Sequence, residues 1–202
     1  MKAIQIHEHG GTDALKWDDI PEPKLSVNQV LVDIKATSLN HLDIWVRKGI
    51  PGVHLPLITG SDAAGIILAV GDGVKKSRIG EKVMIQPLMF CGKCASCNKG
   101  KENLCKSMGI MGENCQGVNA ERITVKESQA IPFPDQLSFE AAASFALVAQ
   151  TSFQMLVSRA KLQAGEFVLI WGASSGVGSM GIQIAKTMGA TVIAIAGTNE
   201  KC

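Results

Sequence analysis

The 202-residue sequence lacks a long uncharged apolar run, a strong excess of either charge and a signal-peptide-like beginning. Its longest apolar stretch, around residues 141–149, is too short to span a bilayer, which takes about 20 residues. A net charge of +2 gives no reason to expect nucleic acid or a membrane surface as a partner. The N-terminal residues MKAIQIHEHGG contain no apolar run of signal-peptide length. The expected compartment is therefore the cytoplasm.

Apolar residues make up 46% of the chain and charged residues 19%, as in an ordinary globular protein with a sizeable core. A chain of this length holds one large or two modest domains. Up to about residue 125, short alternating segments are separated by Gly, Pro, Asn and Asp, which predicts an irregular antiparallel β-barrel. The expected strands cover residues 2–6, 30–36, 65–70 and 82–86.

The period of the apolar residues becomes helical after residue 138. Ser138 and the alanine-rich run behind it are typical of a helix N-terminus, and a second helical segment is expected over residues 151–159. This change of period indicates a domain boundary. We therefore expect a first domain over residues 1–128 and a second over residues 129–202.

Residues 167–197 predict a strand, a glycine turn, a helix and a second strand, the order that the dinucleotide fingerprint requires. Both strand segments are continuously apolar, as in parallel strands covered on both faces. A tight turn there exposes helix N–H groups and the positive end of the helix dipole, which suits a pyrophosphate. The alternative is that the glycines only permit close packing of helix and sheet. The candidate cofactor contacts are Gly172, Ala173, Ser174, Ser175, Gly176, Val177 and Gly178.

The end of the second strand carries no acidic residue, where one would bind the ribose 2′-hydroxyl of NAD. The chain reads AGTNEK over residues 196–201 instead. Thr198 and Lys201 are the candidate contacts of a 2′-phosphate, so we expect NADP rather than NAD as the cofactor. Glu200 is the residue that would favour NAD.

Four of the six cysteines lie within 15 residues, with the spacing C-x2-C-x2-C-x7-C. In a chain expected in the cytoplasm, this spacing predicts a metal site rather than disulfides, and free surface thiols are the alternative. Four thiolates leave no position for water, so one structural zinc is expected. An iron–sulfur run would have proline after its last cysteine, whereas Lys106 stands there. The expected zinc ligands are Cys91, Cys94, Cys97 and Cys105.

Together these features resemble the medium-chain dehydrogenase/reductase superfamily, the zinc alcohol dehydrogenases and quinone reductases. The resemblance covers essentially the whole chain, through the segments NHLD (40–43) and LITGSDAAG (57–65), residues 142–151, the cysteines and the glycine turn. It implies a fold that is α/β plus mainly β: a GroES-like irregular β-barrel catalytic domain followed by an incomplete Rossmann domain, with hydride chemistry in the cleft between them. It also implies that the sequence is truncated at its C-terminus and that the full-length protein is a homo-oligomer.

The resemblance also reveals departures from the zinc-dependent members. Asn40 and Ser61 stand where those proteins have a cysteine and a histidine that bind the catalytic zinc. Asp62 keeps the acid, whereas Leu147 stands near their second cysteine, and Leu42 replaces the hydroxyl that takes the alcohol proton. Amide and hydroxyl oxygens are poor replacements for thiolate and imidazole. We therefore expect neither a catalytic zinc nor alcohol oxidation.

The resemblance then implies hydride transfer without a metal, in which NADPH reduces a small-molecule quinone, enone or enoyl thioester. The matching catalytic positions are Asn40, His41, Asp43 and Thr151. Asn40 is expected to donate to the substrate carbonyl. His41 is expected to shuttle a proton or to contact the cofactor phosphate, unless its imidazole is only structural. Trp45, on the same loop, is expected in the core, the commoner place for a tryptophan, and the alternative is that it shapes the substrate cleft.

Two other functions remain open from the sequence. A zinc alcohol dehydrogenase with unusual ligands such as Asp62, His41 and His54 would bind two zinc ions per chain rather than one. A non-catalytic protein would bind NADPH tightly without turning over any carbonyl or alkene.

Overall fold

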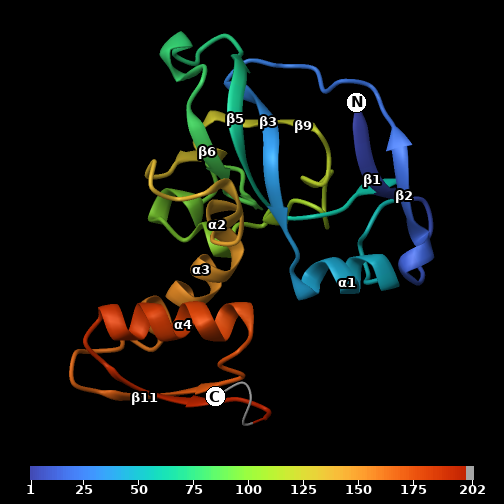
Figure 1. The fold of residues 1–202 in the computed structure, drawn as a ribbon. Helices are drawn as coiled ribbons and strands as arrows, with labels where there is room; N and C mark the ends of the chain where they lie inside the picture. Colours follow the sequence, from blue (N-terminus) through green and yellow to red (C-terminus); the bar gives the residue numbers. More distant parts are fainter. Residues whose placement is uncertain (199–202) are drawn as a thin grey trace. The chain divides into compact units, whose positions relative to one another are not determined.

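The computed structural model describes residues 1–198. The chain divides into two compact units, Met1–Ser144 and a second unit that begins at Phe145 (Figure 1). The predicted domain boundary at residues 128/129 stays a prediction, and the helix that follows Ser138 lies in the first unit. Within the described part of the chain, every helix is too short or too polar to cross a bilayer.

The first unit is mainly antiparallel β-structure, as the alternating segments predict. Within residues 1–144, one sheet has the strand order β2-β1-β4, a larger one has the order β10-β6-β5-β3-β9, and β7 pairs with β8. The strands are β1 (Lys2–Ile6), β2 (Leu15–Asp19), β3 (Gln29–Ser38), β4 (Leu57–Ile58), β5 (Asp62–Val70), β6 (Lys82–Ile85), β7 (Leu88–Met89), β8 (Gly109–Ile110), β9 (Arg122–Lys126) and β10 (Ala130–Pro132).

Helical segments of the first unit are short. The α-helices are α1 (His41–Lys48) and α2 (Phe139–Ala143). Ser138 caps α2, since its hydroxyl oxygen accepts a hydrogen bond from the N–H of Ala141 at 3.2 Å. The 3-10 turns are η1 (Thr12–Ala14), η2 (Lys76–Arg78), η3 (Cys97–Lys99), η4 (Glu102–Leu104) and η5 (Glu127–Gln129).

Two hydrophobic clusters hold the parts of the first unit that carry candidate site residues. Because strand side chains alternate between the two faces of a sheet, Val30 of β3 and Ile67 of β5 point into one core and are fully buried or nearly so. In a separate cluster, Val46 of α1 packs with Ile6 of β1 and Leu57 of β4. This second cluster fixes α1 against its sheet.

The second unit contains the predicted strand, glycine turn, helix and second strand. Its elements are α3 (Ala146–Phe153), the π-helical segment η6 (Gln154–Arg159), β11 (Phe167–Trp171), α4 (Gly176–Thr187) and β12 (Thr191–Ile195). The two strands pair in parallel, from Phe167 opposite Thr191 to Trp171 opposite Ile195, and Figure 1 shows α4 beside β11. The helix expected over residues 151–159 begins earlier, at Ala146, and becomes π-helical at Gln154.

One face of the β11–β12 pair departs from the sequence-based expectation. Ile170 is buried in a cluster that includes Ala185 of α4, whereas Phe167 and Trp171 are 73% and 80% exposed. Side chains of a strand alternate between faces, and α4 covers only one of them. The expectation that these strands are covered on both faces is therefore not met within residues 1–198.

Candidate functional site

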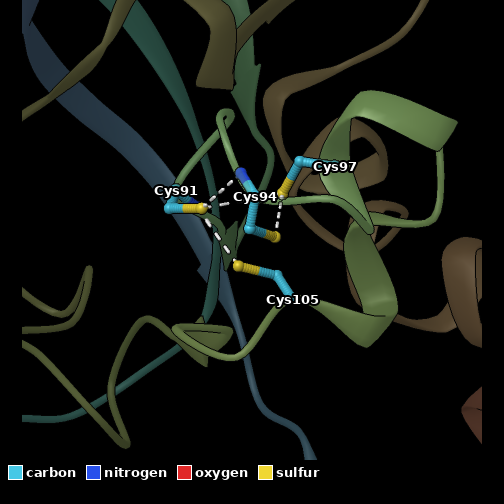
Figure 2. A group of neighbouring side chains, drawn as sticks. All are labelled: Cys91, Cys94, Cys97 and Cys105. Atoms are coloured by element: carbon cyan, nitrogen blue, oxygen red, sulfur yellow. Dashed lines mark hydrogen bonds between the residues drawn. The ribbon is translucent and has the colours of Figure 1, made fainter.

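The four spaced cysteines form a compact cluster. Figure 2 shows Cys91, Cys94, Cys97 and Cys105 pointing toward one another, and all four Sγ atoms lie within 4.8 Å of one another. The Sγ of Cys97 lies 3.9 Å from that of Cys91 and 3.5 Å from that of Cys94. With Zn–S bonds of about 2.3 Å, the sulfur atoms of a tetrahedral site lie about 3.8 Å apart. The donor set and its spacing are therefore compatible with one zinc ion.

Tight turns and backbone donors build this cluster. Gly92 and Gly100 adopt φ of 72° and 65°, a region that favours glycine, and they let the segment fold back on itself. The N–H of Cys94 donates to the Sγ of Cys91 at 3.3 Å, and the N–H of Cys91 donates to the Sγ of Cys105 at 3.4 Å. Such N–H donors orient the ligands of a metal and favour the charged thiolate.

The thiols of this cluster differ in acidity. Hydrogen bonds from the backbone and the thiol of Cys97 lower the pKa of Cys94 to about 6. Hydrogen bonds from backbone N–H groups, that of Lys93 foremost, also lower the pKa of Cys91. Burial, together with the neighbouring Cys94, raises the pKa of Cys97 to about 12. Before any ion binds at pH 8, Cys94 is therefore a thiolate and Cys97 a thiol.

Zinc binding at pH 8 is expected to release at least one proton and fewer than four. Cys97 must lose its proton to bind the metal, whereas Cys94 has already lost its own. As the pH falls, protons compete for every thiol and the affinity for zinc falls, with Cys94 joining the competition below about pH 6. Proton release on adding zinc to metal-free protein, followed with a pH indicator, checks this, and release of four protons would contradict it.

A second group of candidate residues lies at the start of α1. Asn40 is the N-cap, and its N–H donates to the Oδ2 of Asp43 at 2.7 Å while the N–H of Asp43 donates to the carbonyl of Asn40 at 3.0 Å. The amide Nδ2 of Asn40 donates to the Oδ2 of Asp62 at 2.9 Å. Asp43 is 9% exposed and Asp62 is fully buried. Burial raises the pKa of Asp43.

The outer face of α1 carries His41 and Trp45. His41 is exposed, and its ring meets that of Trp45 edge-on, with the centroids 4.8 Å apart. The expectation that Trp45 lies in the core is wrong, because it is 53% exposed. Residues four apart share one face of a helix, and here Leu42 and Val46 occupy the inner face instead.

Thr151 and Ser61 were also singled out in the sequence. Thr151 is in α3 of the second unit, where it is exposed and its hydroxyl donates to the carbonyl of Leu147 at 2.9 Å. Ser61 is fully buried next to Asp62, and its hydroxyl donates to the carbonyl of Met111 at 2.8 Å. Within the first unit, Asn40, His41 and Asp43 lie together at the start of α1.

The contact between Asn40 and Asp62 is absent from the sequence-based expectations. The two residues are 22 positions apart, too far for any local spacing rule to connect them. They meet because Ser38, the last residue of β3, pairs with Asp62, the first residue of β5, and Asn40 follows two residues later. The pairing of residues 29–38 with residues 62–70 as antiparallel strands would have predicted this contact.

The glycine turn has the local geometry of an anion-binding helix start. Ser175 caps α4, since its Oγ accepts a hydrogen bond from the N–H of Gly178 at 3.0 Å. A Cβ on Gly178 would clash with the carbonyl oxygen of Gly172 and lie 2.9 Å from the Cα of Ala173. Gly178 is therefore needed for packing, as the alternative explanation requires. The first turn of α4 also leaves N–H groups without intrahelical partners at the positive end of the helix, which fits a phosphate.

The other predicted cofactor contacts divide by burial. Ser174 and Gly176 are exposed beside the turn, Val177 is half-buried and Ala173 is buried. Thr198 is exposed and lies just after β12. Lys201 lies outside the described residues, so its contact with a 2′-phosphate stays a prediction, as do the roles of the other cofactor contacts.

Known proteins resemble the chain throughout. Residues 26–135 match the family of alcohol dehydrogenase GroES-like domains. The alcohol dehydrogenase of Geobacillus stearothermophilus is 36% identical over 100% of this chain and 59% of its own. The crotonyl-CoA carboxylase/reductase of Cereibacter sphaeroides is 34% identical over 98% of this chain and 49% of its own.

The fold has a counterpart among solved structures. An NAD-dependent alcohol dehydrogenase matches with a TM-score of 0.96 at 42% sequence identity, over 100% of this chain and 59% of that one. The chain thus spans between 49% and 59% of the length of these relatives.

Proposed function

Because the chain belongs to the medium-chain dehydrogenase/reductase superfamily, with a GroES-like domain followed by part of a Rossmann domain, we propose that it is an oxidoreductase. In this proposal it reduces quinones, enones or enoyl thioesters with NADPH and uses no catalytic zinc. The observation that carries the proposal is the hydrogen bond between Asn40 and Asp62. A relative named for the reduction of an enoyl thioester, the crotonyl-CoA carboxylase/reductase, supports the substrate class.

The side chains around Asp62 support chemistry without a catalytic metal. Zinc binds lone pairs of thiolate, imidazole or carboxylate. Here Asn40 directs an N–H donor to Asp62, and Ser61 directs its O–H donor to the carbonyl of Met111. These N–H and O–H donors beside Asp62 do not fit a zinc ion, so the reduction proposed here uses none.

The residues at the start of α1 supply what the reduction needs from the protein. NADPH, when bound, would supply a hydride to the far carbon of the activated double bond. The electron pair of that bond moves onto the carbonyl oxygen, where Asn40 stabilises it with its second amide hydrogen. His41, exposed beside Asn40, delivers the proton that completes the reduction.

Two segments of the chain bind separate ligands in the proposed function. The turn from Gly172 to Gly178 binds the pyrophosphate of NADPH at the start of α4, and Thr198 binds the 2′-phosphate together with Lys201. The cysteine cluster holds one structural zinc. The partners are a small-molecule substrate and further copies of the protein, with no nucleic acid and no membrane, and the proposed compartment is the cytoplasm.

The proposed function is tested by steady-state kinetics. Purified protein is expected to oxidise NADPH in the presence of quinones, enones or enoyl thioesters, and to prefer NADPH to NADH, since no acid follows β12 at residues 196–198. The rates are measured from the absorbance of NADPH, which falls when an acceptor is reduced. With NADP and a panel of primary alcohols, the same absorbance rises if an alcohol is oxidised. Oxidation of primary alcohols with no reduction of any acceptor would contradict the proposal.

A zinc alcohol dehydrogenase is the second candidate function. It is favoured by the relative from Geobacillus stearothermophilus and by the similar solved structure, both named alcohol dehydrogenases. This function requires a second zinc ion beside Asp62, and metal content therefore separates the two candidates.

A further inference from the structure

Two buried carboxylates hold Asn40 from two sides. Asp43 accepts a hydrogen bond from the main-chain N–H of Asn40 at 2.7 Å, and Asp62 accepts one from its side-chain Nδ2 at 2.9 Å. We infer that Asp62 is a positioning residue, which fixes the plane of the Asn40 amide so that its second N–H is aimed at the substrate carbonyl. This inference rests on the proposed function, in which Asn40 contacts that carbonyl.

The main chain of Asn40 is fixed first. Asp43 closes a reciprocal pair of hydrogen bonds with it, at 2.7 Å through the carboxylate and at 3.0 Å through the backbone. Asp43 is itself 9% exposed, and α1 is anchored through the fully buried Val46. Asp43 therefore sets where the Cα of Asn40 lies.

The amide group is fixed by Asp62. A planar amide has two N–H groups in one plane, so that a hydrogen bond from one of them determines the direction of the other. Asp62 is fully buried at the start of β5 and is paired in register with Ser38, which makes it a rigid acceptor. A hydrogen bond to a carboxylate is roughly twice as strong as one between neutral groups.

Burial determines which part of the amide faces outward. Asp62 is fully buried and Asn40 is half-buried, so the part of the amide that solvent or a substrate reaches is turned away from Asp62. In this inference, the second N–H of Asn40 is the part of the amide that faces that side. A donor that is already oriented needs no reorganisation when charge develops on the carbonyl oxygen, and a misplacement of about 1 Å costs about a hundredfold in rate.

A double-mutant cycle tests this inference. Asp62→Ala is expected to lower kcat for an enone by about tenfold to a hundredfold, with the Kd for NADPH unchanged. Asn40→Ala is expected to lower kcat by a similar factor. Adding Asp62→Ala to it is expected to lower kcat no further, because Asp62 affects the substrate through Asn40. Asp62→Asn keeps an acceptor oxygen at the same place and is expected to restore most of kcat.

A matched control separates positioning from a general loss of structure. Ser61→Ala removes the hydrogen bond of a neighbouring side chain that is as buried as Asp62 and does not contact Asn40, and it is expected to lower Tm while keeping kcat within about twofold. Losses that add in the double variant, or a loss in Ser61→Ala equal to that in Asp62→Ala, would overturn the inference.

A readout without turnover keeps the inference distinguishable from the proposed function. In NMR spectra of the wild-type protein, one hydrogen of the Asn40 side-chain amide is expected to exchange slowly with water, and to exchange fast in Asp62→Ala. Wild-type protein that reduces no acceptor would overturn the proposed function. Slow amide exchange in that same protein would still support the hydrogen bond by which Asp62 orients the amide of Asn40. Fast exchange of both amide hydrogens in the wild type would overturn the inference that Asp62 orients Asn40.

Discussion

Substitution of Cys105 by serine is expected to reduce the zinc content from about one ion per chain to nearly none and to lower Tm by about 10 °C. Cys105 is 7% exposed, and its Sγ accepts hydrogen bonds from the N–H groups of Cys91 and Ser107 at 3.4 Å each. It is therefore the most buried of the four expected zinc ligands, and the ion needs it to complete four-coordination. A zinc level about a thousandfold above Kd stabilises the folded state by about 4 kcal/mol. In a chain of 150–250 residues, each kcal/mol shifts Tm by about 2–4 °C.

The control for this prediction is Cys115→Ser. Cys115 lies outside the cluster, with its Sγ 3.3 Å from the Sδ of Met89, and the same chemical change there is expected to leave the zinc content at one. Elemental analysis by mass spectrometry and differential scanning calorimetry of both variants give the two quantities. Full zinc content and an unchanged Tm in Cys105→Ser would refute a stabilising metal at this cluster.

Substitution of Gly178 by alanine is expected to destabilise the second unit by about 3 kcal/mol and to weaken NADPH binding by more than about tenfold. The added Cβ would clash with the carbonyl of Gly172 and lie 2.9 Å from the Cα of Ala173, and neither backbone atom can turn away as a flexible side chain would. The start of α4 would therefore move off β11. Because the predicted pyrophosphate contacts are the N–H groups of that same turn, stability and binding are expected to fall together.

Gly197→Ala is the matched control in the same unit. A Cβ on Gly197 meets nothing within 4 Å, so this variant is expected to keep the Tm of the wild type. Urea unfolding followed by circular dichroism and titration with NADPH by fluorescence measure the two effects. If Gly178→Ala binds NADPH as the wild type does, the glycine turn does not hold the cofactor in the way proposed here.

Sequence patterns predicted most of the fold where the signal is local. The strand, helix and strand of residues 167–195 follow from two apolar runs and a glycine turn, and the structure confirms the parallel pair. The two-residue strands β4, β7 and β8 were beyond prediction, because two residues show no periodicity. Residues 41–48 form helix α1 rather than the expected loop, and its N-cap Asn40 with Asp43 three residues later, and Gly49 at its end, are helix signals in the sequence.

In the candidate site, too, the contacts between residues close in the sequence were predictable, and those that depend on strand pairing were not. The cysteine cluster was predictable because its four thiols lie within 15 residues and need only local turns to meet. The contact between Asn40 and Asp62 depends on the register of β3 against β5, which residue spacing does not reveal. The position of Trp45 was mispredicted because its burial depends on which face of α1 the core receives, and Val46 rather than Trp45 fills that place.

The most direct test of the whole account is an anomalous difference map recorded at the zinc edge from crystals of the protein grown with zinc and NADPH. The account predicts one zinc peak per chain, among the sulfur atoms of Cys91, Cys94, Cys97 and Cys105, and an unbroken hydrogen bond between Asn40 and Asp62. A second zinc peak bound to Asp62, with Asn40 displaced from it, would contradict reduction without a catalytic metal.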